Sequence, residues 1–330
     1  MARSRRVIVT ALLAVGGAVL LFLQINKVGL PAIADGLRKV GPGFAGILLV
    51  SYLRFVARAA AWMALLGEPV KLSRAVAAVI AGDAVGKTPL SLLLSEPAKA
   101  MYLGNPSGPG RALAALTAEN FFYAVSIAIY ITLGTAAFLV AYDLPADAEV
   151  VATIALAAMA ALLAGAAWLA WQKPSLVSGF VARLPIRRLA TTIDRLREFE
   201  LQTYGAVGRE GARLGRVALA EASFHALSLV EAWFTLWLLT GLSLPLEAFV
   251  LDTFSRVANI VFNMVPMRIG VDQFGSSELA QAIRRPVADG FNLSLVRLLR
   301  QLVWMGVGVL LLAGRRPRTS RGAPPSPSTS

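Results

Sequence analysis

Six long runs of apolar residues follow one another along the chain, separated by short polar connections. They cover residues 7–23, 44–66, 112–142, 150–171, 217–239 and 293–312. A helix of about 20 apolar residues spans the hydrocarbon core of a bilayer. The pattern therefore predicts an all-α polytopic membrane protein with about six full transmembrane helices.

Two further apolar segments are interrupted by residues that break helices. Residues 75–103 contain Gly82, Gly86 and Pro89, and residues 249–283 contain Pro266, Gly270 and Gly275. Broken apolar segments at matching places in two halves of a chain are typical of transporters built from inverted repeats. We therefore expect each segment to form a re-entrant helical hairpin.

A short sequence echo links the two broken segments. The first segment contains Ser95-Glu96-Pro-Ala-Lys99-Ala, and the second contains the similar stretch Ser277-Glu278-Leu-Ala-Gln-Ala. Two interpretations are open: a duplication that produced an inverted repeat, or a chance match in Ala-rich sequence.

The distribution of charge orients these elements in the membrane. Basic residues precede the first run, dominate residues 172–216 and follow the last run from Arg315 onward. Loops rich in Lys and Arg stay in the cytoplasm, whereas the acidic connection at 142–150 suits the outside. Both termini are therefore expected in the cytoplasm, with residues 26–43 as an external loop. The hairpin at 75–103 then enters from the cytoplasm, and the hairpin at 249–283 enters from outside.

Composition supports the same class. The chain is 57% hydrophobic and only 15% charged, which exceeds the apolar content of ordinary soluble domains. The net charge is +13, and the basic residues that produce it flank the apolar runs. We therefore expect contact with a membrane surface and no nucleic-acid partner.

A single transmembrane domain is expected over residues 1–313. Within it, residues 172–216 show apolar residues at helical spacing opposite arginines, which predicts basic amphipathic helices on the cytoplasmic membrane surface. The alternative is a solvated helical linker that docks on the protein. Residues 314–330 are rich in Pro and Ser and are expected to be a disordered cytoplasmic tail.

Charged residues inside apolar segments are the candidate functional groups. A lone ionised group at the bilayer centre costs roughly 2.5–3.5 kcal/mol, so such groups pair internally or face water and usually mark function. The alternative is that they form buried ion pairs which lock the hairpins together. The candidate substrate-binding residues are Arg54, Arg58, Lys87, Glu96, Lys99, Arg111, Glu119, Arg256, Asn263, Arg268, Asp272, Glu278 and Arg297.

Arg54 and Arg58 share one helical face at i and i+4, where like charges repel. An anionic ligand would relieve that repulsion, and snorkelling toward headgroups is the alternative. Arg111 with Glu119, and Arg297 with Arg300, are further polar entries into apolar runs and allow the same two interpretations. Positive helix ends at the hairpin breaks would add anion-binding capacity, with Lys87, Lys99, Arg58 and Arg268 expected to bind phosphate.

Several other chemistries are disfavoured. Residues 81–88 match a relaxed phosphate-binding loop, but an apolar helix precedes them and Pro89 follows at once. The chain has no Cys and one His, so we expect no metal site, no cofactor and no catalytic residue. His225 shares a face with Glu221 and Ser228, where an interhelical hydrogen bond is favoured over a proton relay.

These motifs together resemble the flippase-like transmembrane region of the lysylphosphatidylglycerol synthase family. The resemblance rests on Arg58-x-x-x-Trp62-x-x-Leu-Leu66, on 86–99 with its Ser-Glu pair, on Glu119 and on Val265-Pro-Met-Arg-Ile-Gly270 through Glu278. It implies a bacterial inner-membrane protein that moves lipids between leaflets. The sequence departs from the full-length synthases in showing no soluble aminoacyl-transfer domain, so we expect a stand-alone transmembrane region.

The expected function is therefore a flippase-like lipid transporter, not an enzyme. Its cargo would be an anionic or phosphate-bearing lipid, such as a phospholipid, an aminoacylated phospholipid or an isoprenoid-linked lipid. One alternative is a membrane-embedded transferase that acts on a lipid-linked substrate. Another is a non-catalytic partner of a lipid-synthesis enzyme.

Overall fold

The computed structural model describes residues 2–86, 95–103, 109–143, 146–172, 211–262 and 265–314, and within these ranges every regular element is helical. The elements are α1 Ala2–Val28, α2 Leu30–Val40, α3 Gly43–Leu66, α4 Leu72–Gly86, α5 Ser95–Leu103, α6 Pro109–Ala141, α7 Ala146–Gln172, α10 Gly211–Thr240, α11 Pro245–Val261, the 3-10 turn η2 Pro266–Arg268, α12 Val271–Ala282 and α13 Val287–Ala313. The expected helices at 172–216 and the expected tail at 314–330 lie almost wholly outside the described residues.

Five helices are long and apolar enough to cross a membrane. They cover Gly43–Leu66, Arg111–Ala141, Glu149–Trp168, Gly211–Thr240 and Val287–Ala313, and the bent pair formed by α1 and α2 provides a sixth candidate. The prediction of an all-α polytopic membrane protein with about six spans is confirmed.

The connection at 26–43 is helical, so the prediction of a loop there is wrong. The chain turns by 90° between α1 and α2. Gly29 has φ 85°, and a proline occupies the first turn of α2. Asn292 of α13 donates a hydrogen bond to the carbonyl of Ala32 at 3.2 Å, which ties α2 to the start of the last helix. Tertiary contacts therefore hold a short helix that the Gly-Leu-Pro sequence marks as a break.

The first hairpin consists of α4 and α5, which pack on each other. Fifteen residues of α4 give a length of roughly 22 Å, less than the roughly 30 Å of a hydrocarbon core. Gly82 does not interrupt the segment as expected, since α4 continues through it. Its missing side chain instead makes room for the stem of Lys99, and Ser95 donates a hydrogen bond to the Gly82 carbonyl at 2.9 Å.

The second hairpin consists of α11 and α12 and breaks where the sequence predicts, around Pro266 and Gly270. Met267, Arg268 and Gly270 have φ of 51°, 53° and 84°, a left-handed region that ends a helix. Gly275 does not interrupt the chain as expected; it lies within α12, where the ring of Phe254 from α11 fills the space beside it.

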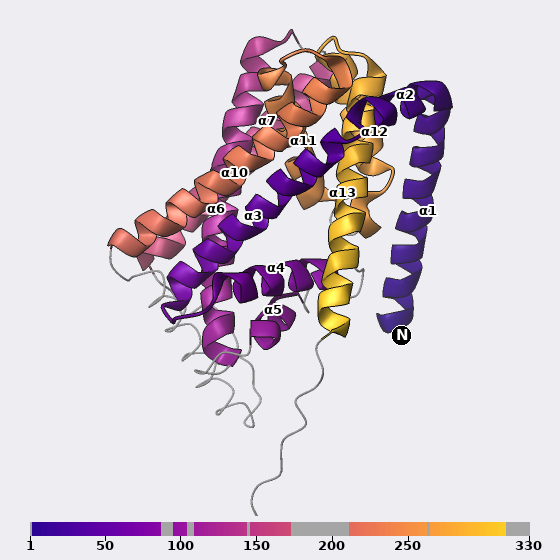
Figure 1. Cartoon of the computed structure of the whole chain (residues 1–330). Helices are drawn as coiled ribbons and strands as arrows, with labels where there is room; N and C mark the ends of the chain where they lie inside the picture. Colours follow the sequence, from indigo (N-terminus) through magenta and orange to yellow (C-terminus); the bar gives the residue numbers. More distant parts are fainter. Residues whose placement is uncertain are drawn as a thin grey trace, which may run out of the picture.

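The two hairpins occupy opposite ends of α13. Gly290, near its start, touches the Ser276 carbonyl of α12, and Gly308, near its end, touches the side chain of Ala84 from α4. Eighteen residues of helix separate these contacts by about 27 Å. The hairpins therefore approach the centre of the molecule from opposite directions (Figure 1).

The helix order supports an inverted repeat. A long helix, two short helices and a long helix form α3–α6, and the same order recurs in α10–α13. The packing is exchanged between the halves, because α4 packs against α13 while α11 packs against α6. The helices α3 and α10 pack along each other and run side by side in Figure 1.

The two largest apolar cores among the described residues lie above and below the middle of this bundle, and a smaller one joins Ile131 of α6 to Met159 of α7. One surrounds Trp62 at the end of α3, with residues of α4, α5 and α6. The other surrounds Leu236 and Leu251, with residues of α2, α3, α10 and α13. The space between them is lined by polar residues.

Candidate functional site

Charged side chains meet at the middle of the long helices, between the two apolar cores. Arg54 is residue 12 of the 24 in α3, His225 is residue 15 of the 30 in α10, and Arg300 is residue 14 of the 27 in α13. We call this set the central polar layer. Its members are Arg54, Arg58, Glu119, Ser126, Tyr130, Glu221, His225, Ser228, Glu231, Asp252, Arg256, Arg297 and Arg300.

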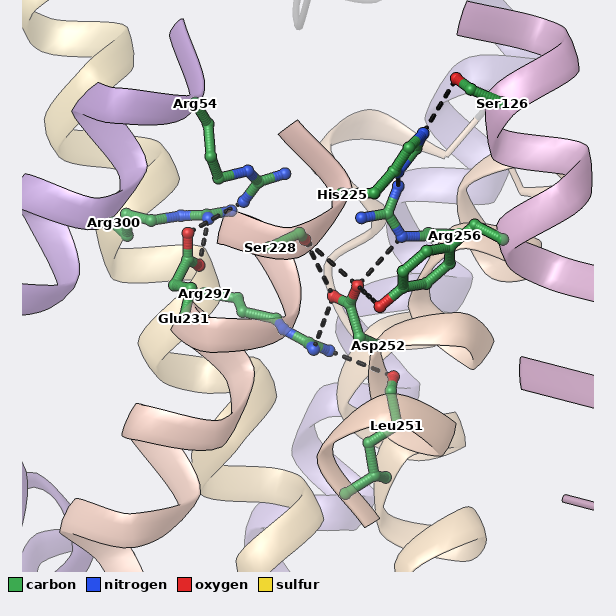
Figure 2. Close-up of polar contacts among 11 residues, drawn as sticks. Arg54, Ser126, His225, Ser228, Glu231, Leu251, Asp252, Arg256, Arg297 and Arg300 are labelled. Carbon is green, nitrogen blue, oxygen red and sulfur yellow. Dashed lines mark hydrogen bonds and ion pairs between the residues drawn. The ribbon is translucent and has the colours of Figure 1, made fainter. Parts of the chain in front are cut away.

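Glu231 of α10 lies between two guanidinium groups. Arg54 of α3 donates to it at 2.9 Å, and Arg300 of α13 pairs with its other oxygen. The residue is only 3% exposed. One carboxylate thus faces two arginines, which leaves a local excess of one positive charge (Figure 2).

Asp252 of α11 is the second such centre. Arg256, one helical turn later, donates to it at 3.0 Å, and Arg297 of α13 donates at 3.1 Å. The hydroxyls of Tyr130 and Ser228 donate to the same carboxylate at 2.9 and 3.1 Å. Figure 2 shows Ser228, Arg256 and Arg297 converging on Asp252. Two arginines again meet one carboxylate.

Arg58 forms a balanced pair with Glu119 of α6, to which it donates at 2.8 Å. This pair joins α3 to α6, as Glu231 and Arg300 join α10 to α13. Arg58 lies 14 residues before Leu72, the start of α4, and Glu231 lies 14 residues before Pro245, the start of α11. The two halves therefore place opposite charges at equivalent positions.

Aromatic rings cover three of the arginines. The guanidinium carbon of Arg58 lies 4.1 Å from the ring centre of Tyr123, that of Arg256 lies 4.1 Å from Tyr130, and that of Arg54 lies 4.8 Å from Phe224. Cation–π contact is worth about 2 kcal/mol when the cation is desolvated. The rings therefore stabilise buried positive charge without neutralising it.

His225 connects two parts of the layer. Its Nδ1 lies 2.9 Å from a terminal nitrogen of Arg256, and its Nε2 lies 2.9 Å from the hydroxyl of Ser126 on α6. Ser126 in turn donates to Glu221 at 3.1 Å. The predicted interhelical hydrogen bond of His225 is confirmed. Within the described part of the chain, Glu221 forms no ion pair.

Some hydrogen-bonding atoms of the layer are buried without a partner among the described residues. These are Nε of Arg54, Nη2 of Arg256, one oxygen of Glu221 and Oε1 of Glu119, the last of which still lies within ion-pair distance of Arg58. Buried polar atoms are normally satisfied by protein, water or a ligand. Two of the four are guanidinium donors, which suit an anionic acceptor.

The structure brings five of the sequence-predicted site residues into the central polar layer. These are Arg54, Arg58, Glu119, Arg256 and Arg297. Lys87 and Asn263 lie outside the described residues.

The six others pair elsewhere. Glu96 pairs with Lys99 within α5 at 2.7 Å, and Arg268 pairs with Asp272 in the second hairpin at 3.4 Å. Arg111 pairs with Glu68 at 3.3 Å, and Glu278 pairs with Lys27 of α1 at 2.6 Å on an exposed face. We expected Lys99 and Arg268 to lie with Arg58. In the described contacts each of the two pairs instead with a carboxylate of its own hairpin, Lys99 with Glu96 and Arg268 with Asp272.

Sequence reasoning left out Glu231, Asp252 and Ser126, and weighed Arg300 and His225 without selecting them. A signal was present on α10, since Glu221, His225, Ser228 and Glu231 recur at a spacing of three or four residues in an apolar helix. Such a stripe marks one polar face. Among the described residues, no group of three or more Asp, Glu or His side chains is arranged to hold a metal ion.

The fold and this layer define a multi-pass α-helical membrane protein with an arginine-rich ionic centre between two inverted halves. Residues 7–282 match the family described as the lysylphosphatidylglycerol synthase TM region, and the chain belongs to this family. Searches of curated proteins and of solved structures found no match.

Proposed function

We propose that the protein carries an anionic lipid headgroup between the two leaflets, with the central polar layer as its binding site. The observation that carries this proposal is the ratio of charges at Glu231 and Asp252, each of which faces two arginines. With Glu119 and Glu221 included, the layer holds five arginines and four carboxylates, and one uncompensated charge at this depth costs roughly 2.5–3.5 kcal/mol on insertion scales. A phosphate group would offset that cost and accept the unpartnered donors of Arg54 and Arg256.

The arrangement of the hairpins supports movement around this site. Transporters with inverted repeats expose a central site to each side in turn, as one repeat rocks against the other. Here α4 and α11 each pack against the last helix of the opposite half. Small shifts of either hairpin would open a path from one end while the other stays closed, and the acyl chains would remain in the bilayer.

Membership of the lysylphosphatidylglycerol synthase TM region supports a lipid as the cargo. We also propose that the protein resides in the inner membrane with both termini in the cytoplasm, as the basic flanks indicate. No chemical change to the lipid is part of the proposal.

Reconstitution into vesicles tests the proposal. The purified chain is inserted into phosphatidylcholine vesicles that carry acyl-labelled phosphatidylglycerol, and arrival of the label in the outer leaflet is followed by quenching. We expect translocation well above that of protein-free vesicles, and faster for phosphatidylglycerol than for labelled phosphatidylcholine. Equal rates with and without protein would overturn transport, and equal rates for both lipids would overturn the preference for an anion.

Mass spectrometry of the lipids after the same assay separates the alternatives. A new lipid species would favour a membrane-embedded transferase. Absence of both translocation and modification would favour a non-catalytic partner of a lipid-synthesis enzyme.

A further inference from the structure

The hydrogen bonds around His225 have a defined direction. A guanidinium group can only donate, so the contact with Arg256 at 2.9 Å makes Nδ1 of His225 the acceptor. The ring proton is therefore on Nε2, which donates to Ser126 at 2.9 Å. The single hydroxyl proton of Ser126 has two acceptors in reach, an oxygen of Glu221 at 3.1 Å and the carbonyl of Tyr123 at 3.0 Å. The donors therefore run from Arg256 to His225 and from His225 to Ser126, whose hydroxyl lies against Glu221 and the carbonyl of Tyr123.

Because of this direction, Nδ1 of His225 cannot carry a proton while Arg256 donates a hydrogen bond to it. A proton on Nδ1 of His225 would point at the guanidinium of Arg256, where there is no acceptor. His225 can therefore bind a second proton only after Arg256 withdraws from it. In the present state the imidazole ring is neutral.

The surroundings of the ring reinforce this exclusion. Tyr123 and Tyr130 of α6 stack on its faces, with ring centres 6.1 and 5.1 Å away. The charged groups that face it are Arg256 and Asp252 of α11, Arg54 and Arg58 of α3, and Glu221 of α10 through Ser126. Three arginines face two carboxylates, so a proton added while Arg256 stays in place would be repelled.

Arg256 is built to accept a competing anion. It is 7% exposed; its Nε binds Asp252, its Nη1 binds His225, and its Nη2 is buried without a partner among the described residues. A phosphate binds an arginine most strongly through two parallel hydrogen bonds. Such a phosphate would take Nη1 and Nη2 together and so displace Nδ1 of His225.

We infer that His225 is a proton-binding site whose occupancy is linked to the lipid: the anionic headgroup takes Arg256, and His225 takes one proton at Nδ1. This inference rests on the proposed function. The proton comes from water on the side to which the site is open and returns to water on the other side, and no bond of the lipid breaks. Glu221, which lacks a cation of its own, stands as the counter-charge of the imidazolium through Ser126. A lipid of charge −1 and one proton cross together without net charge.

A pH gradient across reconstituted vesicles tests this linkage. Vesicles of phosphatidylcholine and acyl-labelled phosphatidylglycerol receive a gradient of about two pH units, with the membrane potential clamped by valinomycin and potassium. We expect phosphatidylglycerol to accumulate in the leaflet that faces the alkaline side, by up to about 100-fold for one proton per lipid.

Variants locate the proton. In His225→Gln the ratio of gradient-driven to gradient-free translocation should fall to one, whatever the absolute rate. Ser223→Ala is the matched control, because Ser223 lies on the same helix, is half-buried and, among the described residues, donates a hydrogen bond only to Leu219 of its own helix. It should keep the wild-type ratio.

Proton uptake provides a second readout that does not require transport. When phosphatidylglycerol is added to the detergent-solubilised wild-type protein in weak buffer, the protein should take up about one proton from the solution for each lipid that it binds. The His225→Gln variant should take up none. Translocation that ignores the gradient, without proton uptake, would overturn the linkage and leave the proposed function intact. Failure of the wild-type protein to move phosphatidylglycerol would overturn both.

Discussion

Arg58 and Glu231 occupy equivalent positions in the two halves of the chain and carry opposite charges, each 14 residues before the helix that opens its hairpin. Arg58 pairs with Glu119 of the long helix that follows the first hairpin, and Glu231 pairs with Arg300 of the long helix that follows the second. The pairs Arg58–Glu119 and Glu231–Arg300 each lie within one half, whereas Arg54 of α3 pairs across the halves with Glu231.

The pair of Arg58 and Glu119 should show strong coupling in a double-mutant cycle. Glu119→Gln leaves a buried guanidinium unpaired and should destabilise the protein by about 3 kcal/mol, because breaking one side of a buried pair is the expensive step. The double variant with Arg58→Gln should lose less than the sum of the two single changes. Thermal unfolding in detergent measures these values, with Glu149→Gln on the exposed part of α7 as control. Additive losses would contradict a direct pair.

Arg54→Gln should weaken the binding of anionic lipid without unfolding the protein. Glu231 keeps Arg300 as its partner after this change, so no carboxylate is left unpaired. We expect retention of phosphatidylglycerol to fall roughly tenfold, as for loss of one charge-assisted hydrogen bond. Native mass spectrometry measures retention, and the exposed Arg38→Gln on α2 should retain lipid as the wild type does. Unchanged retention in Arg54→Gln would remove Arg54 from the binding site.

Two adjacent glycines of α1 should respond differently to substitution. Gly17 lies against the backbone of Ile269 and Gly270 at the break of the second hairpin, whereas no other element of the described structure comes within 4 Å of where a side chain at Gly16 would begin. Gly17→Val should push α1 from the hairpin and cost about 1–3 kcal/mol, as overpacking does. Gly16→Val should change stability by no more than about 0.5 kcal/mol. Equal melting temperatures for the two variants would contradict this contact.

A second matched pair tests the other end of the molecule. Gly308 of α13 touches Ala84 and the carbonyl of Ile80 in α4, and Gly306 of the same helix has no such neighbour. Gly308→Leu should separate α13 from the first hairpin and slow lipid translocation in vesicles, because both halves meet at this contact. Gly306→Leu, in the same assay, should translocate at the wild-type rate. If both variants translocate alike, the contact between α4 and α13 has no part in transport.

The orientation of the chain is testable because the sequence contains no cysteine. Cysteines introduced by Asp147→Cys and Thr319→Cys should react with an impermeant reagent from opposite sides of the membrane, the first from outside and the second from the cytoplasm. The basic flanks and the acidic connection at 142–150 are the reason for this expectation. Labelling of both from one side would mean that the hairpins do not have the proposed orientation.

The apolar runs by themselves determined the class of protein and its long helices, because about 20 successive apolar residues are stable only as a helix across a bilayer. Pro266 and Gly270 likewise marked the break in the second hairpin, since neither favours a continuing helix. The prediction failed at residues 26–43, which the pattern of apolar runs left as a loop, although contacts with α13 hold the helix α2 there. It also failed at Gly82 and Gly275, which serve packing inside helices.

The central polar layer was decided by tertiary structure. Arg54 and Glu231 are separated by 177 residues along the chain, and Arg58 and Glu119 by 61, so no spacing rule connects them. The sequence showed that cations lie within apolar segments, and the cost of burying charge indicates that they must find partners. Which carboxylate each cation meets depends on the packing of α3 along α10 and on the exchange of hairpins between the halves. For that reason Lys99 and Arg268 pair within their own hairpins, whereas Glu231 and Asp252, unselected in the sequence, each hold two arginines at the centre.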